Sequence, residues 1–115
     1  MAEMIRKSFR APDEVLEFPD GKYDVIELDG LGVGRLVAEP GWPYSTSLGS
    51  NCPTHHGAWL MISGRLAVEM EDGTVEEFGP GDIGIIPPGH DAWVVGDEPA
   101  VGIDFQPGGI DTSAA

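Results

Sequence analysis

The sequence predicts a single all-β domain, built as an antiparallel sandwich or barrel. Its 115 residues suit one hydrophobic core. Seventeen glycines and ten prolines interrupt the chain every few residues, which leaves no room for a long helix. Between these breaks lie short runs rich in branched and aromatic side chains, and each run is bounded by a turn signal. Many short strands at close spacing are typical of sandwiches and barrels.

The N-terminal region is expected to be an arm, helical or extended, that precedes the barrel. We predict an arm at 1–22, the barrel at 23–106 and a frayed tail at 107–115. Pro12 to Phe18 is the one helical candidate, because Pro12 suits a first turn and Asp13 and Glu14 favour the positive end of a helix. Pro19-Asp20-Gly21 would end this helix after about two turns.

The remaining elements are expected to be strands joined by tight turns. Asp29-Gly30 separates the first two strands, and Asp72-Gly73 is a strong hairpin signal because both residues tolerate positive φ. Gly79-Pro80-Gly81-Asp82 is predicted to be a further turn. The expected strands are 23–28, 31–39, 58–63, 65–71, 74–78, 83–86, 92–95 and 100–105, with an irregular stretch at 42–54.

Composition and charge exclude several classes of function. Twenty acidic and six basic residues give a net charge of −14, so attraction to phosphate backbones or anionic membranes is absent. No apolar run approaches the ~20 residues of a membrane span, and the N-terminus is charged where a signal peptide is apolar. One cysteine, Cys52, rules out an internal disulfide and a paired-cysteine zinc site. We therefore expect a cytoplasmic protein with neither a nucleic-acid nor a membrane partner.

Two segments resemble the cupin superfamily of double-stranded β-helix, or jelly-roll, barrels. Gly81-Asp82-Ile83-Gly84-Ile85-Ile86-Pro87-Pro88-Gly89 is similar to the first part of the second cupin motif. Leu60-Met61-Ile62-Ser63-Gly64-Arg65-Leu66 is similar to the end of the first motif, and Glu39-Pro40-Gly41-Trp42 to its entry. The resemblance covers 39–105, more than half of the chain. It implies a cupin barrel that binds a small organic molecule and pairs as a homodimer, for which the arm could be exchanged.

The usual cupin metal ligands are missing from their expected places. Most metal-binding cupins supply two histidines and a glutamate from the first motif and a third histidine from the second. In this sequence those positions fall near Ser50, Cys52, Gly57 and Ala92. A metal therefore cannot be carried over from the family by position.

All three histidines nevertheless lie in the two motifs, as His55, His56 and His90. By strand parity, His55 matches position 57 and His90 matches position 92, so both could point into the barrel; His56 is the alternative to His55. The three histidines form a candidate site for one divalent transition metal such as zinc, iron, nickel or manganese, with Cys52 as a possible fourth ligand. Neutral histidines that form hydrogen bonds at the barrel mouth are the competing interpretation.

His90 is also the candidate catalytic residue under a second hypothesis, in which the protein acts without a metal. A histidine in an apolar barrel can transfer a proton if a carboxylate orients it, as in the metal-free sugar epimerases of this superfamily. Asp91 is its neighbour and faces the other way, so Asp104 or Glu39 would have to supply the carboxylate.

Four large side chains are candidates for ligand contact. Trp42, Tyr44 and Trp59 could stack on a planar or sugar ligand, and Met61 continues the face of Trp59. Core or interface packing is the competing interpretation for each. The resulting hypothesis is a small-molecule-binding cupin with a histidine-lined mouth, and possible metal-dependent chemistry of oxygenase, isomerase or lyase type. The alternatives are a metal-free binding or sensor domain without activity, and a purely structural role.

Overall fold

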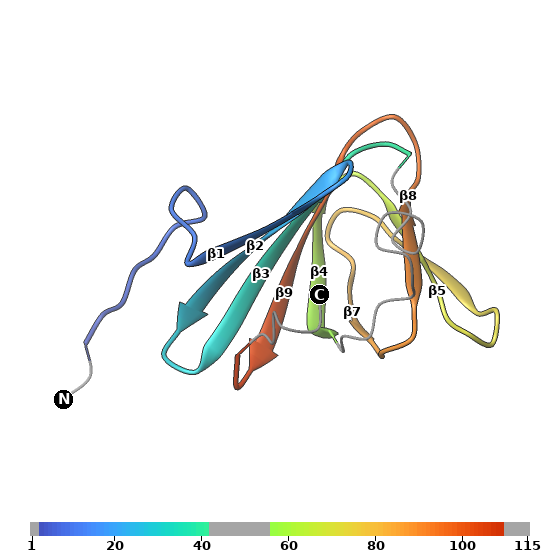
Figure 1. Ribbon diagram of the computed structural model, residues 1–115. Helices are drawn as coiled ribbons and strands as arrows, with labels where there is room; N and C mark the ends of the chain where they lie inside the picture. The colour runs from blue at the N-terminus through green and yellow to red at the C-terminus, as the bar shows by residue number, and fades with distance from the viewer. Residues whose placement is uncertain (1–2, 42–55, 110–115) are drawn as a thin grey trace.

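The computed structural model describes residues 3–41 and 56–109 (Figure 1). Their strands form two antiparallel sheets, which confirms the all-β barrel. One sheet has six strands in the order β1-β2-β3-β9-β4-β7, and the other has three in the order β6-β5-β8. The strands are β1 (Glu14–Phe18), β2 (Gly21–Leu28), β3 (Leu31–Ala38), β4 (His56–Ser63), β5 (Leu66–Glu69), β6 (Val75–Phe78), β7 (Ile83–Ile86), β8 (Asp91–Val94) and β9 (Ala100–Pro107).

The helix expected at 12–18 is wrong, because this segment forms β1 instead. Glu14 to Phe18 pairs with β2 in antiparallel register, from Glu14 opposite Val25 to Phe18 opposite Gly21. Pro19 and Asp20 are the two central residues of the hairpin, and Asp20 has φ of 62°. Proline followed by a residue with positive φ is the signature of a type II turn. The sheet therefore includes residues 14–22, which the sequence assigns to the arm, and the described residues before its first strand are 3–13.

The turns between the other strands follow their sequences closely. Asp29 and Gly30 both have positive φ and join β2 to β3 with Leu28 opposite Leu31, which is the pattern of a type I′ hairpin. Asp72-Gly73 lies in the longer connection 70–74 between β5 and β6, where Gly73 has φ of 89° and the Asp72 side chain accepts a hydrogen bond from the Thr74 amide at 2.9 Å. Strand β9 runs to Pro107, slightly beyond the predicted end.

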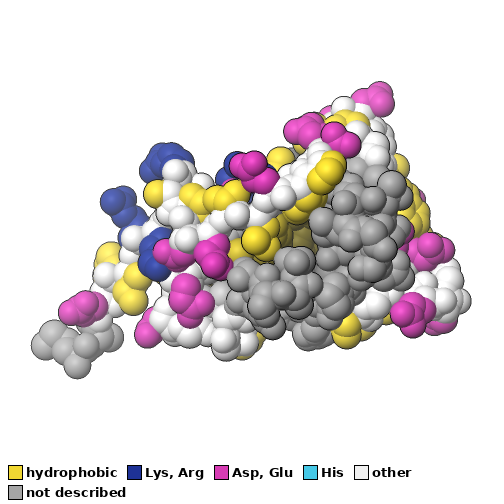
Figure 2. Space-filling model, in the orientation of Figure 1, with side chains coloured by type: hydrophobic (Ala, Val, Ile, Leu, Met, Phe, Trp, Pro, Cys, Tyr) yellow, Lys and Arg dark blue, Asp and Glu magenta, His cyan; other side chains and the backbone are white. Residues whose placement is uncertain are grey.

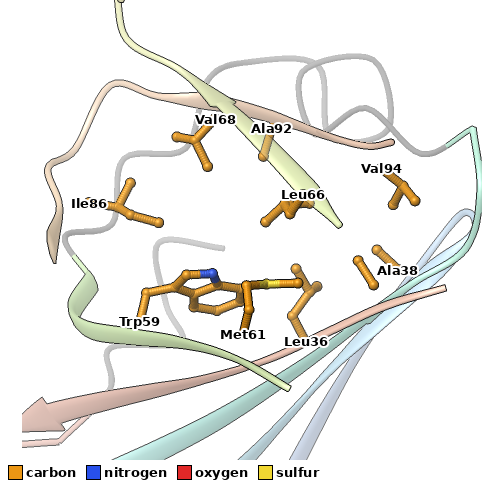
Figure 3. Close-up of a cluster of buried hydrophobic side chains, with 10 residues drawn as sticks. Leu36, Ala38, Trp59, Met61, Leu66, Val68, Ile86, Ala92 and Val94 are labelled. Carbon is orange, nitrogen blue, oxygen red and sulfur yellow. The ribbon is translucent and has the colours of Figure 1, made fainter. Parts of the chain in front are cut away.

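The hydrophobic core fills the space between the two sheets (Figure 3). Trp59 and Met61 project from β4 toward Val68 and Leu66 of β5, and Ile86 closes one side. Each of these side chains alternates with an outward-facing neighbour along its strand, as period-two packing requires. The buried cluster consists of Leu36, Ala38, Trp59, Met61, Leu66, Val68, Ile86, Ala92, Val94 and Ala100.

Candidate functional site in the barrel

The two ends of the barrel differ in polarity. At one end, Ala38 lies opposite Ala100 and Leu66 lies opposite Val94, and Met61 is packed beside them in the same apolar cluster. The strand registers place Gln106, the start of β4 and the end of β7 at the other end. His90 lies in the connection from β7 to β8, and therefore at this second end. We call this second end the mouth end; it lies at the bottom of Figure 1.

A buried carboxyl group lies on the inner face toward the mouth end. Asp104 of β9 has no exposed surface, and its Oδ2 accepts hydrogen bonds from the Tyr23 hydroxyl at 3.2 Å and from the Gln106 side-chain amide at 3.4 Å. Tyr23 comes from β2, two strands away from β9 in the sheet. A buried carboxyl group has to be hydrogen-bonded, because desolvation without partners is costly. The polar cluster of Tyr23, Asp104 and Gln106 is therefore a built feature of the barrel interior.

Two glycines make room for the aromatic rings beside Asp104. A Cβ at Gly34 would lie 2.0 Å from the Tyr23 hydroxyl oxygen, so the Tyr23 ring crosses β3 over this glycine to reach Asp104. A Cβ at Gly102 would lie 2.2 Å from the Trp59 ring in the same way. Trp59 is also the register partner of Asp104 on the neighbouring strand. The carboxyl group thus has an aromatic residue on either side.

His90 is buried, with 3% of its surface exposed, and its ring is held by the backbone. Its Nδ1 lies 2.8 Å from the Pro87 carbonyl oxygen. Because a carbonyl only accepts hydrogen bonds, this contact assigns the proton of a neutral ring to Nδ1 and leaves the lone pair on Nε2. The group that orients Nδ1 is thus a carbonyl of its own turn and no carboxylate. The sequence offers two carboxylates that could orient the ring of His90, Glu39 and Asp104. Glu39 is exposed and Asp104 is buried.

The other candidate residues are placed as follows. Trp59 and Met61 lie on the inner face, as strand parity predicts, and both belong to the buried core. Trp42, Tyr44 and His55 lie outside the described residues, as does Cys52. For His56 the backbone is described, and it pairs with Ile86 at the start of β4. Within residues 3–41 and 58–109, no three histidine, aspartate, glutamate or cysteine side chains converge as a metal site would require.

The placement of cationic side chains restricts what the barrel can hold. The sequence has six lysines and arginines, and the structure describes all of them. Three lie before β1, two lie on the outer face of the large sheet beside Asp24, and Arg65 pairs with Glu77 at 2.8 Å outside the barrel. None therefore faces the buried carboxyl group of Asp104. The six residues are Arg6, Lys7, Arg10, Lys22, Arg35 and Arg65.

Sequence reasoning missed Tyr23 and Gln106 as parts of the site. A signal was present, because Gly32 and Gly34 share one face of a predicted strand, and glycine inside a strand often marks the close approach of another group. This signal does not identify the approaching group. That group is Tyr23, which lies eleven residues before Gly34 on the neighbouring strand.

Solved structures share this fold at low sequence identity. Ectoine synthase from P. lautus superposes with a TM-score of 0.69 at 15% identity, over 91% of this chain and 79% of that one. An oxalate decarboxylase from Lactobacillus farciminis, in a formate complex, gives 0.63 at 20% identity over 80% of this chain. An oxalate decarboxylase from Bacillus subtilis gives 0.61 at 23% identity over 86%. The chain spans 30% and 28% of these two decarboxylases. No protein-family model and no curated protein matches the sequence.

Proposed function

Because this chain has the cupin fold, we propose that it binds a small organic molecule at the polar, mouth end of its barrel. The observation that carries the proposal is the buried cluster of Tyr23, Asp104 and Gln106. A barrel whose only task is to be stable would gain more from apolar side chains there, because a buried carboxyl group costs desolvation energy. The opposite end of the same barrel, around Met61 and Ala100, is built from such apolar side chains.

The charge of the interior defines the class of ligand. Asp104 offers a carboxyl group, Tyr23 a hydroxyl and Gln106 an amide, and no lysine or arginine faces them. Such a set binds hydroxyl and amine groups well and has no cation to hold a carboxylate. We therefore infer that the ligand is a neutral polyol or an organic cation. It differs in this respect from oxalate and formate, which the similar decarboxylases act on or hold.

Ligand-induced stabilisation tests this proposal. Myo-inositol, choline and oxalate serve as neutral, cationic and anionic probes, and the melting temperature of the purified chain is the measurement. We expect a neutral or cationic probe to raise the melting temperature, since a ligand at about 100 times its Kd adds about 2.7 kcal/mol to stability. Asp104→Asn should abolish the shift, whereas Glu39→Gln, which removes an exposed carboxylate, should keep it. Stabilisation by oxalate alone would contradict the proposed ligand class.

A metal-dependent enzyme is the second candidate function, and the tethered ring of His90 favours it. A histidine that ligates a metal commonly donates its other ring N–H to a carbonyl or carboxylate, as Nδ1 of His90 does toward Pro87. The described side chains do not complete a site, so the remaining ligands would come from the candidates His55, His56 and Cys52. Such a metal would be zinc, iron, nickel or manganese and would supply Lewis-acid or redox chemistry.

Metal content separates the two candidates. Untagged protein is purified without added metal, and the metal per chain is measured by mass spectrometry for the wild type and for His90→Ala. About one equivalent of a single transition metal that is lost in His90→Ala would favour the metal-dependent enzyme. Less than about a tenth of an equivalent, with no uptake on dialysis against these metals, would contradict it.

We also propose that the chain works as a homodimer, as small cupins commonly do. The resemblance to cupins supports the formation of a dimer, and it does not identify the surface through which the two copies pair.

A further inference from the structure

The described residues before β1, 3–13, form an N-terminal arm that carries half of the cations of the chain. These cations are Arg6, Lys7 and Arg10. Figure 2 shows the visible lysine and arginine side chains gathered on the side of the arm, and acidic side chains at the opposite end. The arm is therefore the part of this acidic chain in which positive charge is concentrated.

Two of the six cations stay open, although the chain has twenty acidic residues. Arg6 and Arg10 are exposed, and no described carboxylate pairs with either of them. The other four cations lie 2.8 to 3.7 Å from described carboxylates. These ion pairs are Lys7 with Asp13, Lys22 and Arg35 with Asp24, and Arg65 with Glu77. The two open guanidinium groups lie four residues apart on the arm, where both are available to an anion from solution.

Arg6 and Arg10 line a common cavity of about 430 Å³, which the arm itself forms. This volume lies within the range of small-molecule sites. Three cations and one carboxylate, that of Asp13, leave the lining with a net charge of +2. The residues that line the cavity are Arg6, Lys7, Ser8, Arg10, Ala11 and Asp13.

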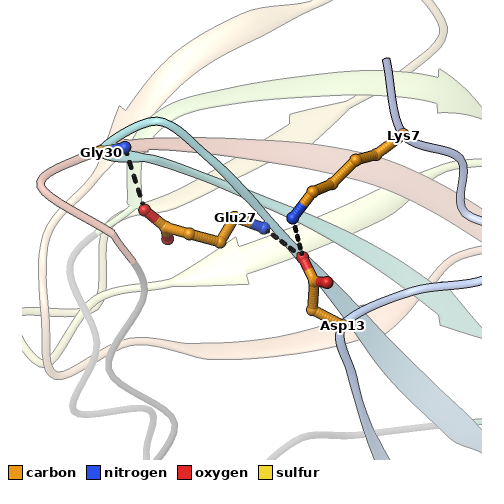
Figure 4. A network of polar contacts seen from close by, with 4 residues as sticks. All are labelled: Lys7, Asp13, Glu27 and Gly30. Carbon is orange, nitrogen blue, oxygen red and sulfur yellow. Dashed lines mark hydrogen bonds and ion pairs between the residues drawn. The ribbon is translucent and has the colours of Figure 1, made fainter. Parts of the chain in front are cut away.

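The segment beside the cavity is held against the sheet at both of its ends. The Phe9 ring lies 4.8 Å from the Arg35 guanidinium, in a cation–π contact. The Asp13 amide donates a hydrogen bond to the Val25 carbonyl at 2.9 Å, and the Asp13 side chain accepts one from the Glu27 amide at 2.8 Å (Figure 4). Because residues 9–13 are already placed, a ligand that binds there meets a smaller ordering cost.

Ser8 and Lys7 add further hydrogen-bond donors to the cavity. Ser8 Oγ accepts a hydrogen bond from the Arg10 amide at 3.1 Å, and no described group accepts the hydroxyl hydrogen. The Lys7 ammonium has three hydrogens, and its contact with Asp13 at 2.9 Å uses one of them. The lining thus combines guanidinium, ammonium and hydroxyl donors, which is a set that suits an anion with several oxygens.

We propose that this cavity binds a phosphate monoester dianion, carried by a soluble metabolite or by a lipid headgroup. Such a group has a charge of about −1.5 to −2 at neutral pH and three acceptor oxygens, which match the charge and the donors of the lining. Arginine binds phosphate in a bidentate manner, and a monocarboxylate brings only one charge. The net charge of −14 does not prevent binding, because charges more than about 8 Å away are largely screened at physiological salt.

This site is separate from the proposed function in the barrel and takes a ligand of the opposite charge from an organic cation. The arm leaves the sheet on the β1 side, whereas Asp104 lies in the barrel interior (Figure 1). The two sites can therefore be tested independently on the same full chain.

A titration of the ¹⁵N-labelled full chain with glycerol phosphate, followed by amide chemical shifts, tests the proposal. It is done at constant ionic strength and about pH 7.5, above the second phosphate pKa of about 6. We expect saturable shifts at the Ser8 and Arg10 amides. Arg6→Gln and Arg10→Gln should each raise the Kd about tenfold, as expected for the loss of a charge-assisted hydrogen bond. Arg65→Gln, which removes an equal charge from the other sheet, should leave the Kd unchanged.

A second measurement identifies the source of the phosphate. Phosphatidylcholine vesicles with and without phosphatidic acid are sedimented with the wild type and with the Arg6→Gln and Arg10→Gln variants. Sedimentation that needs both phosphatidic acid and the two arginines would identify a lipid headgroup, and binding of glycerol phosphate alone would identify a soluble ligand.

Three outcomes would overturn the proposal. They are the absence of both saturable shifts and sedimentation, equal shifts with sodium chloride at the same ionic strength, and an Arg65→Gln effect as large as that of the arm variants. Asp104→Asn should leave phosphate binding intact, because Asp104 does not line this cavity. A failure of the barrel site would thus leave this proposal standing, and the reverse also holds.

Discussion

At the scale of single residues, the hydrogen bond from Tyr23 to the buried carboxyl group of Asp104 depends on a glycine at position 34. Tyr23 reaches Asp104 across β3 only because residue 34 is glycine. The strand pays for this with the lower β propensity of glycine, which has no side chain to pack. The cost is offset by a hydrogen bond to a group that would otherwise lose its hydration.

We predict that Gly34→Ala destabilises the protein through Tyr23 in particular. The new Cβ would overlap the Tyr23 hydroxyl, and overpacking of this kind costs about 1–3 kcal/mol. Urea unfolding is the measurement, in the wild type and in a Tyr23→Ala background, where most of the cost should vanish. Gly30→Ala is the control: it is strained by its φ of 88° and crowds no neighbour, so its cost should be equal in both backgrounds. An undiminished Gly34→Ala cost in the Tyr23→Ala background would contradict the argument.

The sequence could anticipate only part of this site. Asp104 was a candidate carboxylate for orienting His90, and the burial of Trp59, Met61 and His90 agrees with strand parity. The hydrogen bond from Tyr23 to Asp104 joins residues 81 positions apart, and no local pattern encodes such a contact. The carbonyl that holds His90 lies only three residues away, but it becomes visible only once the turn has a conformation.

At the scale of elements, turn chemistry was the most reliable guide. The strand at 83–86 agrees with its prediction. The turn at Asp29-Gly30 lies where its two positive-φ residues require, and the connection that contains Asp72-Gly73 has positive φ at Gly73. A helix at 12–18 was the wrong prediction because Pro12 and two acidic residues satisfy the rules for a helix start. Those rules are local, and pairing with β2 outweighed them. Val15 and Glu17 alternate with Leu16 and Phe18, a period-two pattern that also suits a strand.

The arm is fastened to the sheet at Asp13 (Figure 4). Its Oδ2 accepts hydrogen bonds from the Glu27 amide at 2.8 Å and from the Lys7 ammonium at 2.9 Å. The backbone bond from Glu27, and then the bond from Lys7, lower the pKa of Asp13 below its ordinary 3.8. The arm therefore keeps a charged anchor at neutral pH.

We predict that this anchor makes the hold on the arm depend on pH. A carboxyl group whose pKa is lowered by folding adds stability above its unfolded pKa, and that stability is lost as the pH falls through the lowered value. Asp13→Asn should thus speed exchange of the Glu27 amide hydrogen at pH 7, relative to the intrinsic rate. The difference from the wild type should disappear in strong acid. Glu3→Gln, which removes a charge from the same arm, should have no such effect. An Asp13→Asn protein that matches the wild type at pH 7 would contradict this role.

At the scale of the whole molecule, the charge is unbalanced in amount and in place. The net charge is −14, yet three of the six cations lie within residues 6–10. The structure describes no helix that is long and apolar enough to span a bilayer. Because the net charge is strongly negative and half of the cations lie in residues 6–10, the folded barrel concentrates negative charge. The repulsion between these like charges opposes the compact state.

We predict that salt stabilises the fold at neutral pH. Raising the salt concentration from about 0.01 M to about 1 M shortens the Debye length from about 30 Å to about 3 Å, which screens this repulsion. The urea midpoint at pH 7 and fixed protein concentration should therefore rise with sodium chloride. Near pH 4.2, where the net charge approaches zero, the rise should largely disappear. A midpoint that falls with salt at pH 7 would mean that attractive ion pairs dominate instead.

The position of β9 in the sheet has a consequence for biosynthesis. This strand, Ala100–Pro107, is the last described strand in the chain, and it lies between β3 and β4. While the ribosome is still making the preceding residues, the hairpins of β1 to β3 can form, but they have no neighbour that joins them to β4. The sheet becomes continuous only after β9 has left the exit tunnel. Until then, apolar edges of β3 and β4 stay open to chaperones and to neighbouring nascent chains.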